Sequence, residues 1–426
     1  MKKILIVGAG LSGLTAAYQL AQNFEAQIII IEKGKHYAER VVEDESGMVC
    51  GEGGAGTIYG GKLCFPPASA GVWKRTGFYA DEFAVFCERY LKFFIQNKKF
   101  PESGGISMIL SKTDNFFQKN YESILLTKTE MNCFVSSLLA EVRKYGVDII
   151  TSCEFIDYKK VNDGYIIQCK KNNTETIEEL VDYIIFASGR LSSERIMKWF
   201  GKQKNVRLQN PDLGIRFGID YNRTEIFREI GKDIKLKAQI GDIGLRTFCV
   251  CSGGSKTIVN LNGMKYYDGH FENVITKQVN LGILARSPYI YGFEGAALYC
   301  SYLKEYINLD WSLKDFVKNG DSLIKETNLF VEVFEAIIHF IRMMQKEQIL
   351  EENLDKYPVW LPSVDRLNPI VSTDEHFETN CKNIYVIGDA VGISRGFVQS
   401  MWSGYCAGNR ISEELKGIVQ KEKKRA

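Results

Sequence analysis

The chain has 426 residues and a formal net charge of +2; hydrophobic residues make up 45% of it and charged residues 25%. This length suggests roughly two or three structural units with a large buried core. The small net charge excludes a global field that would draw the chain to nucleic acid or to an acidic membrane. The sequence has no apolar window of about 18 residues, so we expect no segment that spans a bilayer.

The cysteines and the N-terminal segment point to a reducing compartment. Eleven cysteines are scattered without the spacing of a zinc site or of a small disulfide scaffold. Reduced thiols in a cytoplasmic protein fit this distribution best. The apolar run Ile4–Val7 is too short for a signal peptide. The four histidines do not cluster, so no metal site is predicted.

The first elements form one βαβ unit. Residues 3–7 are predicted to be a buried strand, residues 8–13 a glycine-rich turn and residues 14–22 a helix with apolar residues at helical spacing. Residues 27–31 contain four consecutive isoleucines, which is typical of a central parallel strand that is buried on both faces.

The remaining chain alternates between α/β and β-rich segments. Residues 34–125 are predicted to be irregular, and residues 210–300 mostly β. The α/β segments lie at both ends and the β-rich segment lies between them, which favours one domain interrupted by another. Further elements are helices at 132–144 and 328–348, strands at 147–150, within 154–185 and at 384–387, and a last helix from about Gly396.

Gly8, Gly10 and Gly13 form a G-x-G-x-x-G sequence between the first strand and its helix. The first glycine permits a tight turn, the second lets a pyrophosphate approach the backbone, and the third lets the helix pack closely on the strand. The N-terminus of the helix offers free N–H groups and a positive dipole end to phosphates. Glu32, 19 residues after Gly13, stands where a carboxylate accepts hydrogen bonds from ribose hydroxyls. Together they predict an ADP-binding turn, but they do not separate FAD from NAD.

Two later strands also end in glycine-containing turns, Ala187-Ser188-Gly189 and Gly388-Asp389-Ala390. The three turns in this order resemble those of the flavoproteins with a G-x-G-x-x-G fingerprint, a central A-T-G or A-S-G turn and a C-terminal G-D-A turn. This resemblance implies FAD: the central turn runs beside it, Asp389 binds its ribityl chain or pyrophosphate, and the helix from Gly396 directs its N-terminus at the pyrimidine side of the flavin. A helix dipole at that place would stabilise negative charge on the reduced ring.

Three longer segments carry a narrower resemblance. Residues 51–63, 246–254 and 388–400 resemble the G-x-G-G-A-G-T-x-x-D-G-K-L, R-T-F-C-M-C-P-G-G and G-D-A-x-G-x-x-R-G-x-x-Q-S segments of a bacterial family of uncharacterised FAD-dependent dehydrogenases. Two positions depart from this pattern: Gly60 replaces the aspartate and Ser252 replaces the proline. FAD remains implied, whereas any role of that aspartate is absent.

The predicted fold class is α/β, a discontinuous Rossmann-like FAD-binding domain with an inserted β-rich α+β substrate domain. The FAD-binding domain is predicted from residues 1–75, 125–200 and 355–426, and the substrate domain from residues 76–124 and 201–354. The active site is expected between them, over the flavin ring, with residues 246–286 on the substrate side. The residues expected to bind the cofactor are Gly8, Gly10, Leu11, Ser12, Gly13, Glu32, Lys33, Gly53, Gly54, Ala55, Gly56, Lys62, Phe155, Ala187, Ser188, Gly189, Gly388, Asp389, Gly396, Phe397 and Gln399.

Lys62 and Arg395 are the candidate catalytic residues. Lys62 follows the glycine loop 53–56, where a positive charge would lie near flavin N1 or a substrate carboxylate; a solvated lysine is the alternative. Arg395 precedes the last helix and would face the ring, with a salt-bridged structural arginine as the alternative. The loop itself offers backbone donors to the pyrophosphate and the ring, or is a flexible surface loop.

Cys249 and Cys251 form a C-x-C sequence in a predicted strand, which places both thiols on one face. A disulfide between them would be strained, so two buried structural thiols are favoured over a redox-active pair. The sequence has no second G-x-G-x-x-G in mid-chain, so a dedicated nicotinamide domain is not expected.

The favoured function is that of an FAD-dependent oxidoreductase, a dehydrogenase that transfers a hydride between flavin N5 and a small organic substrate. One alternative is a flavin monooxygenase that uses NAD(P)H and oxygen, and another is a non-catalytic flavin-binding redox sensor. Electrons would come from NAD(P)H that docks transiently, from the substrate itself or from a redox partner protein. No nucleic-acid partner is expected.

Overall fold

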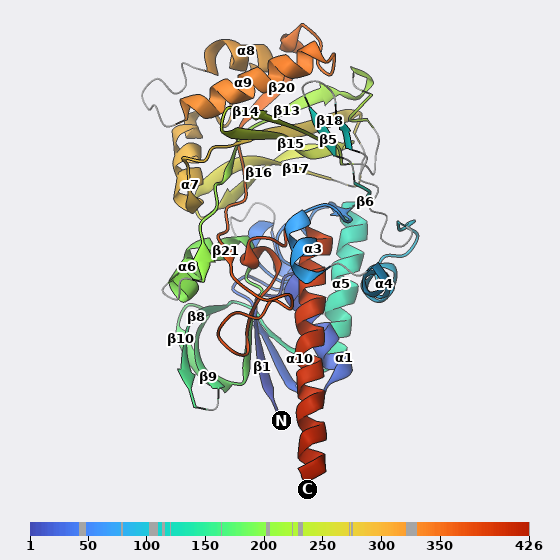
Figure 1. Cartoon of the computed structure of the whole chain (residues 1–426), viewed down its shortest axis with the longest axis vertical. Coiled ribbons are helices and arrows are strands. Elements are labelled where there is room, and N and C mark those ends of the chain that lie inside the picture. Colours follow the sequence, from blue (N-terminus) through green and yellow to red (C-terminus); the bar gives the residue numbers. More distant parts are fainter. Residues whose placement is uncertain are drawn as a thin grey trace.

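The chain forms two hydrophobic cores, one around a parallel sheet and one around a large antiparallel sheet (Figure 1). They confirm the predicted mixed α/β class with a Rossmann-like unit and a β-rich unit. The structure, a computed structural model, describes residues 1–41, 48–77, 80–101, 110–112, 116–119, 121–162, 164–201, 205–223, 225–228, 233–271, 273, 276–320 and 330–425.

A five-stranded parallel sheet forms the first core. Each strand pairs in parallel with its neighbour. The four isoleucines of its second strand in the chain are all buried, as predicted for a parallel strand covered on both faces. In spatial order the strands are β22 (Ile384–Val386), β11 (Tyr183–Phe186), β1 (Lys3–Val7), β2 (Gln27–Ile31) and β7 (Asp148–Ile150).

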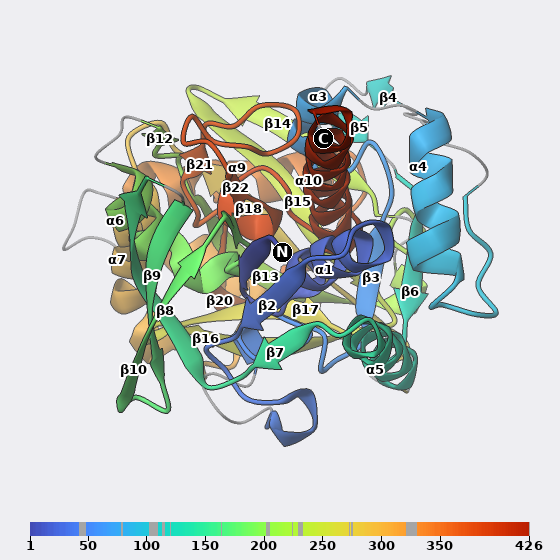
Figure 2. The ribbon, with the colours of Figure 1, turned by 90° about the horizontal axis from the view of Figure 1, so that it is seen from below.

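Helices cover one face of the parallel sheet, and a three-stranded antiparallel sheet covers the other (Figures 1 and 2). The last helix crosses the first closely because Gly404 has no side chain: a Cβ atom there would overlap the carbonyl oxygen of Ser12. The helices are α1 (Leu11–Asn23), α5 (Lys128–Lys144) and α10 (Phe397–Arg425), and the antiparallel strands are β8 (Cys153–Val161), β9 (Gly164–Lys171) and β10 (Glu175–Val181).

The second core lies between an eight-stranded antiparallel sheet and the helices on its outer face (Figure 1). Helix α9 (Val331–Lys346) buries the apolar face predicted for it, including Phe334, Ile337 and Ile341. Its predicted start at Asn328 lies outside the described residues. The strand order is β19 (Trp311–Ser312), β20 (Pro358–Asp365), β13 (Asp212–Asp220), β18 (Gln278–Arg286), β15 (Ile243–Ser252), β14 (Lys235–Ile240), β5 (Phe117–Lys119) and β4 (Leu110–Lys112).

The prediction that residues 34–125 are irregular is wrong for about half of their described part, which forms helices and strands. Helix α4 (Ala80–Phe86) and the π-helical turn after it (Cys87–Lys92) pack aromatic side chains on α10, with the ring centres of Phe86 and Trp402 5.4 Å apart. A seven-residue helix has only about two turns, so its apolar spacing is too short to stand out in the sequence. Although residues 76–124 were assigned to the substrate domain, Phe86 belongs to the first core and β5 to the large sheet. The domain bounds stay a prediction.

Two helices begin earlier than predicted. Helix α1 starts at Leu11, inside the glycine motif. Helix α5 starts at Lys128 because Thr127 and Glu130 form a capping box, which satisfies the first N–H groups. The remaining elements are α3 (Ala70–Thr76), α6 (Ser193–Phe200), α7 (Gly292–Tyr302), α8 (Leu313–Asn319), β3 (Gly61–Cys64), β6 (Ser123–Leu126), β12 (Val206–Arg207), β16 (Ser255–Leu261), β17 (Met264–His270) and β21 (Ile370–Val371), with short 3-10 turns at Tyr37–Glu39, Gly189–Ser192, Tyr221–Arg223, Lys304–Tyr306, Leu354–Lys356 and Gly388–Val391.

Candidate functional site

The three predicted glycine turns meet at the carboxyl edge of the parallel sheet. They follow β1, β11 and β22, which are adjacent strands. Ligands of open α/β sheets bind at this edge. A cavity, called the first cavity below, lies there, and the predicted residues that line it are Gly8, Gly10, Leu11, Ser12, Glu32, Lys33, Gly53, Gly54, Ala55, Phe155, Ala187, Ser188, Gly189, Asp389, Gly396 and Phe397.

The first turn is tightly enclosed by its neighbours. Gly8 has a φ of +111°, and a Cβ atom there would lie 2.5 Å from the carbonyl oxygen of Ala187. At Gly10 the nearest atom to an added Cβ is the Cα of Gly54, at 3.6 Å. Gly53 donates its N–H to the carbonyl of Ala9 over 2.9 Å. The glycine loop is therefore packed on the first turn and is not a free surface loop.

Glu32 organises the same region. Its buried carboxylate accepts hydrogen bonds from the backbone N–H groups of Ala9 at 2.9 Å, Gly34 at 2.8 Å and Gly51 at 2.9 Å. The sequence suggested only a ribose-binding acid at this position. In the structure the acid also ties the first turn to the loop that begins at Gly51.

Several polar groups at the wall of the first cavity have no side-chain partner among the described residues and are available to a ligand. The N-cap of α1 is Gly10, which has no side chain to accept from the first N–H groups of the helix. The first turn of α1 carries no acid that would oppose an anion. The hydroxyl of Ser188 is buried and has no hydrogen-bond partner among the described residues. These groups fit a phosphate-bearing ligand with further hydroxyls.

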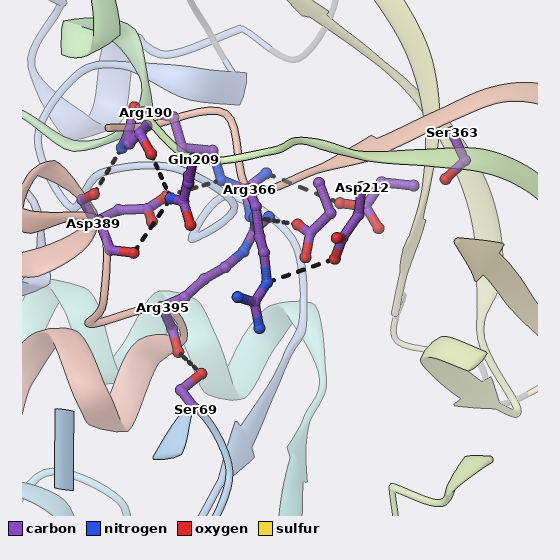
Figure 3. A network of polar contacts seen from close by, with 12 residues as sticks. Ser69, Arg190, Gln209, Asp212, Ser363, Arg366, Asp389 and Arg395 are labelled. Atoms are coloured by element: carbon purple, nitrogen blue, oxygen red, sulfur yellow. Dashed lines mark hydrogen bonds and ion pairs between the residues drawn. The ribbon is translucent and has the colours of Figure 1, made fainter. Parts of the chain in front are cut away.

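A polar network joins the second and third turns (Figure 3). Arg190 donates from Nε to Asp389 Oδ2 over 3.2 Å. The side-chain amide of Asn368 donates to the carbonyl of Asp389 at 2.6 Å and to that of Gly189 at 3.3 Å. Arg190 follows the Ala-Ser-Gly turn directly, a signal that could have identified it. Asn368 lies in no motif, and the sequence analysis missed it.

A second cavity adjoins the first and lies between the parallel-sheet core and the inner face of the large sheet. Its volume is about 490 Å³, within the usual range for a small-molecule site. The predicted residues Gly56, Lys62 and Gln399 line this cavity and not the first. The residues shared by both cavities are Val49, Ala55, Arg190, Asp389, Arg395, Gly396 and Phe397.

Lys62 is largely buried and paired, so the alternative of a solvated lysine is wrong. Its Nζ donates to the carbonyl of Val250 over 2.7 Å and lies 3.3 Å from Asp233 Oδ2, with 11% of the side chain exposed. Burial is the largest single effect and lowers the pKa of Lys62, but Asp233, Cys64, Cys249 and Cys251 together outweigh it and raise the pKa above its ordinary value. Lys62 therefore supplies a permanent positive charge at the wall of the second cavity.

Arg395 lies at the boundary between the cavities and forms an ion pair with Asp365. Its backbone carbonyl accepts from the hydroxyl of Ser69 over 2.7 Å (Figure 3). Asp365 also accepts from Arg246 at 2.6 Å. The ion pair corresponds to the structural alternative for Arg395, although the residue still faces both cavities.

The two thiols of the C-x-C sequence occupy different environments. Strand β15 is irregular here, and Cys249 has a φ of +44°. The sulfur atoms lie 3.6 Å apart, and the hydrogen bond from Cys251 lowers the pKa of Cys249 below its ordinary value. The expectation of two buried thiols is correct for Cys251 alone, since Cys249 is partly exposed and lines the second cavity. All eleven cysteines are free thiols.

The other predicted residues have packing roles. Gly13 lies against the carbonyl of Gly8, which allows α1 to approach β1, and Gly388 donates its N–H to Ser403 Oγ over 2.8 Å. At Gly60 a Cβ atom would lie 2.5 Å from the carbonyl oxygen of Leu126, so this position has no room for the aspartate of the resembling family.

The described residues contain no cluster suited to a metal ion, and within the same ranges no helix is long and apolar enough to cross a bilayer.

The comparison with protein families identifies the N-terminal βαβ unit. Residues 6–50 match the model of a family described as an NAD(P)-binding Rossmann-like domain. No curated protein matches the chain.

Solved structures with a similar arrangement include a flavoprotein/dehydrogenase from Cytophaga hutchinsonii, with 14% identity, 97% of this chain and 79% of that chain covered, and a TM-score of 0.40. A geranylgeranyl bacteriochlorophyll reductase-like protein from Thermoplasma acidophilum is 13% identical over 98% of this chain and 80% of that chain, with a TM-score of 0.41. CabE, an aromatic hydroxylase from angucycline biosynthesis, is 9% identical over 98% of this chain and 63% of that chain, with a TM-score of 0.43. At these identities and scores the similarities carry no statement about activity.

Proposed function

We propose that the chain binds FAD and is an oxidoreductase that transfers a hydride between flavin N5 and a small organic substrate. The observation that carries this proposal is the pair of adjoining cavities. The first is lined by three glycine turns at the carboxyl edge of one parallel sheet, and the second has the volume of a small-molecule site. A dinucleotide in the first cavity would direct its reactive end toward the second.

The residues of the first cavity fit the parts of FAD. The N-terminus of α1 offers N–H groups to the pyrophosphate, and Glu32 stands beside it as an acceptor for ribose hydroxyls. The unpartnered hydroxyl of Ser188 is available to a polar atom of the cofactor. Asp389 also lines this cavity, held by Arg190, and would accept from the ribityl hydroxyls.

When bound, FAD would supply a two-electron acceptor, and the protein would supply orientation and charge. Helix α10 begins at Phe397 with no acid in its first turn, so its positive end faces the boundary of the two cavities. Arg395 and Lys62 add positive charge at the same wall. These groups would stabilise negative charge on a reduced flavin or hold an anionic substrate.

The eleven free thiols support a cytoplasmic location.

A substitution in the first turn tests cofactor binding. Gly10→Glu places a carboxylate where the pyrophosphate would lie, and we expect the purified variant to be colourless, whereas the unchanged protein shows the absorption bands of oxidised flavin. Gly417→Glu is the matched control, because Gly417 lies on α10 with no atom within 4 Å of an added Cβ, and it should stay yellow. Full flavin retention in Gly10→Glu, or no flavin in the unchanged protein even after incubation with FAD, would contradict the proposal.

Anaerobic reduction tests the activity. Bleaching of the flavin bands by NADH or NADPH, followed by reoxidation with an organic acceptor, would support transfer between a docking nicotinamide and a substrate. Oxygen uptake that requires both the nicotinamide and the substrate would instead support the monooxygenase alternative. A bound flavin that neither nicotinamide nor any organic donor reduces would contradict an enzymatic role.

A further inference from the structure

The second cavity carries an excess of positive charge. Eight lysine or arginine side chains and four aspartates line it. The whole chain has a formal net charge of only +2, so this excess is local. Much of it comes from the inner face of the large sheet, where β5, β14 and β15 run side by side.

Strand pairing places like charges directly opposite each other on that face. Lys119 of β5 is opposite Lys235 of β14, and Lys237 of β14 is opposite Arg246 of β15. Opposite residues share a face, and so do residues two apart along a strand, so all four side chains project toward the same side. Like charges in this arrangement destabilise a sheet. Folding alone therefore gives no reason for them.

Acidic partners account for only two of these cations. Asp233 pairs with Lys235 at 2.9 Å, and Arg246 pairs with Asp212 at 2.6 Å. Lys119 donates to the carbonyl of Pro67 at 3.0 Å. In the described ranges, no acid forms an ion pair with Lys119 or Lys237. Burial, and then the neighbouring cations, lower the pKa of both lysines, that of Lys237 to about 8.

Two aromatic rings lie among the cations and also line the second cavity. The Nζ of Lys119 is 5.4 Å from the ring centre of Tyr121, and the guanidinium of Arg246 is 5.0 Å from that of Phe248. Such rings offer an apolar surface to the hydrocarbon part of a ligand. The cavity thus combines cations that have no acidic partner with flat apolar walls.

We propose that the second cavity binds an organic anion, a carboxylate or a phosphate ester, whose charged group contacts Lys119 and Lys237 and whose apolar part packs on Tyr121 and Phe248. This inference rests on the proposed function in that it assigns the substrate class of the same enzyme. Phe397, at the boundary with the first cavity, would then face the part of the ligand that reacts.

Calorimetric titration of the purified full chain with benzoate, phenyl phosphate and benzamide tests the site. We expect at least one anion to bind and neutral benzamide not to bind. Lys119→Gln and Lys237→Gln should each weaken anion binding roughly tenfold, since each removes a hydrogen bond from a charged group. Lys265→Gln is the control, because Lys265 is exposed on β17 outside both cavities, and it should leave the affinity unchanged. Tighter binding of benzoate identifies a carboxylate, and tighter binding of phenyl phosphate a phosphate ester.

Three results would overturn the inference: no binding of either anion, equal binding of benzamide, or unchanged anion affinity in both glutamine variants. The flavin content of the same sample separates the two proposals. A yellow protein that binds neither anion contradicts the anion site alone. A protein that binds an anion through Lys119 and Lys237 but takes up no FAD contradicts the proposed function alone.

Discussion

Gly404 sets the close crossing of α1 and α10, and replacing it by alanine tests how the first cavity is built. The new Cβ atom would overlap the carbonyl oxygen of Ser12 and lie 3.1 Å from the backbone nitrogen of Ala16. Both atoms belong to the backbone of α1, so neither can rotate away. The helices must separate, and overpacking of this kind costs up to about 3 kcal/mol.

The intrinsic helix preference of alanine offsets part of that cost. Replacing glycine by alanine in a helix interior stabilises by about 1 kcal/mol, so the free energy of unfolding should fall by a net ~2 kcal/mol. Gly417→Ala, on the same helix with no atom within 4 Å of its new Cβ, should instead gain about 1 kcal/mol. Urea denaturation followed by circular dichroism measures both changes. Changes of the same sign and size in the two variants would refute the argument.

The same substitution should also weaken the binding of the cofactor. Ser12, whose carbonyl the new methyl group would displace, lines the first cavity. If FAD occupies that cavity, Gly404→Ala should lose flavin more readily on dilution than Gly417→Ala. Equal flavin retention in the two variants would show that the first turn keeps its position without the close crossing.

Two further predictions concern charge and hydrogen bonding. Burial, followed by Lys119, Arg246 and Arg366, lowers the pKa of Lys237 from 10.5 to about 8, so between these pH values the unfolded chain binds more protons and the contribution of Lys237 to stability rises with pH. Lys237→Gln should remove that rise and stabilise the protein at pH 7. The gain should be less than about 1 kcal/mol, because the residue as a whole is exposed and solvent screens its charge, although its ammonium group is partly buried at the cavity wall. An unchanged pH profile of urea unfolding would argue against this prediction. Asn368→Ala leaves the carbonyls of Asp389 and Gly189 without their side-chain donor and should cost about 1–3 kcal/mol in the free energy of unfolding. A loss below the error of the urea titration would mean that water replaces the amide.

The sequence predicts the first cavity well because its parts are local. Each glycine turn directly follows a strand of the parallel sheet, and the carboxyl ends of parallel strands share one edge. The turns that contain Gly8, Ser188 and Asp389 can therefore be placed together from the order of the strands, without considering side-chain packing. The sequence does not show that Glu32 accepts three backbone hydrogen bonds, because two of the donors, Ala9 and Gly51, are distant from Glu32 in the sequence.

The sequence predicts an active site between the two units, but several residues of the second cavity escape prediction because they meet through tertiary contacts. Gln209 and Asn368, which line this cavity and share a hydrogen bond, are far apart in sequence and belong to different segments. Lys119 and Lys237 come together through antiparallel register, which composition and motifs do not determine. The two thiols lie close together, but the sequence does not show that Cys249 is partly exposed, because the strand is irregular where Cys249 has a positive φ.

The two cavities therefore differ in the groups that build them. The first is made largely of backbone: N–H groups at the start of α1 and glycines whose missing side chains leave room. Such groups recognise any ligand with the right phosphate geometry. Their sequence pattern is constrained because larger residues would not fit at the glycine positions. The anion site proposed in the second is made of charged side chains on three strands, where exchanging one lysine should change the preferred ligand and leave the strand pairing intact. If this proposal is correct, substrate preference can change through Lys119 and Lys237 while the glycine turns stay unchanged. The glycine motifs therefore indicate the cofactor, whereas the pairing register of the strands indicates an anionic substrate.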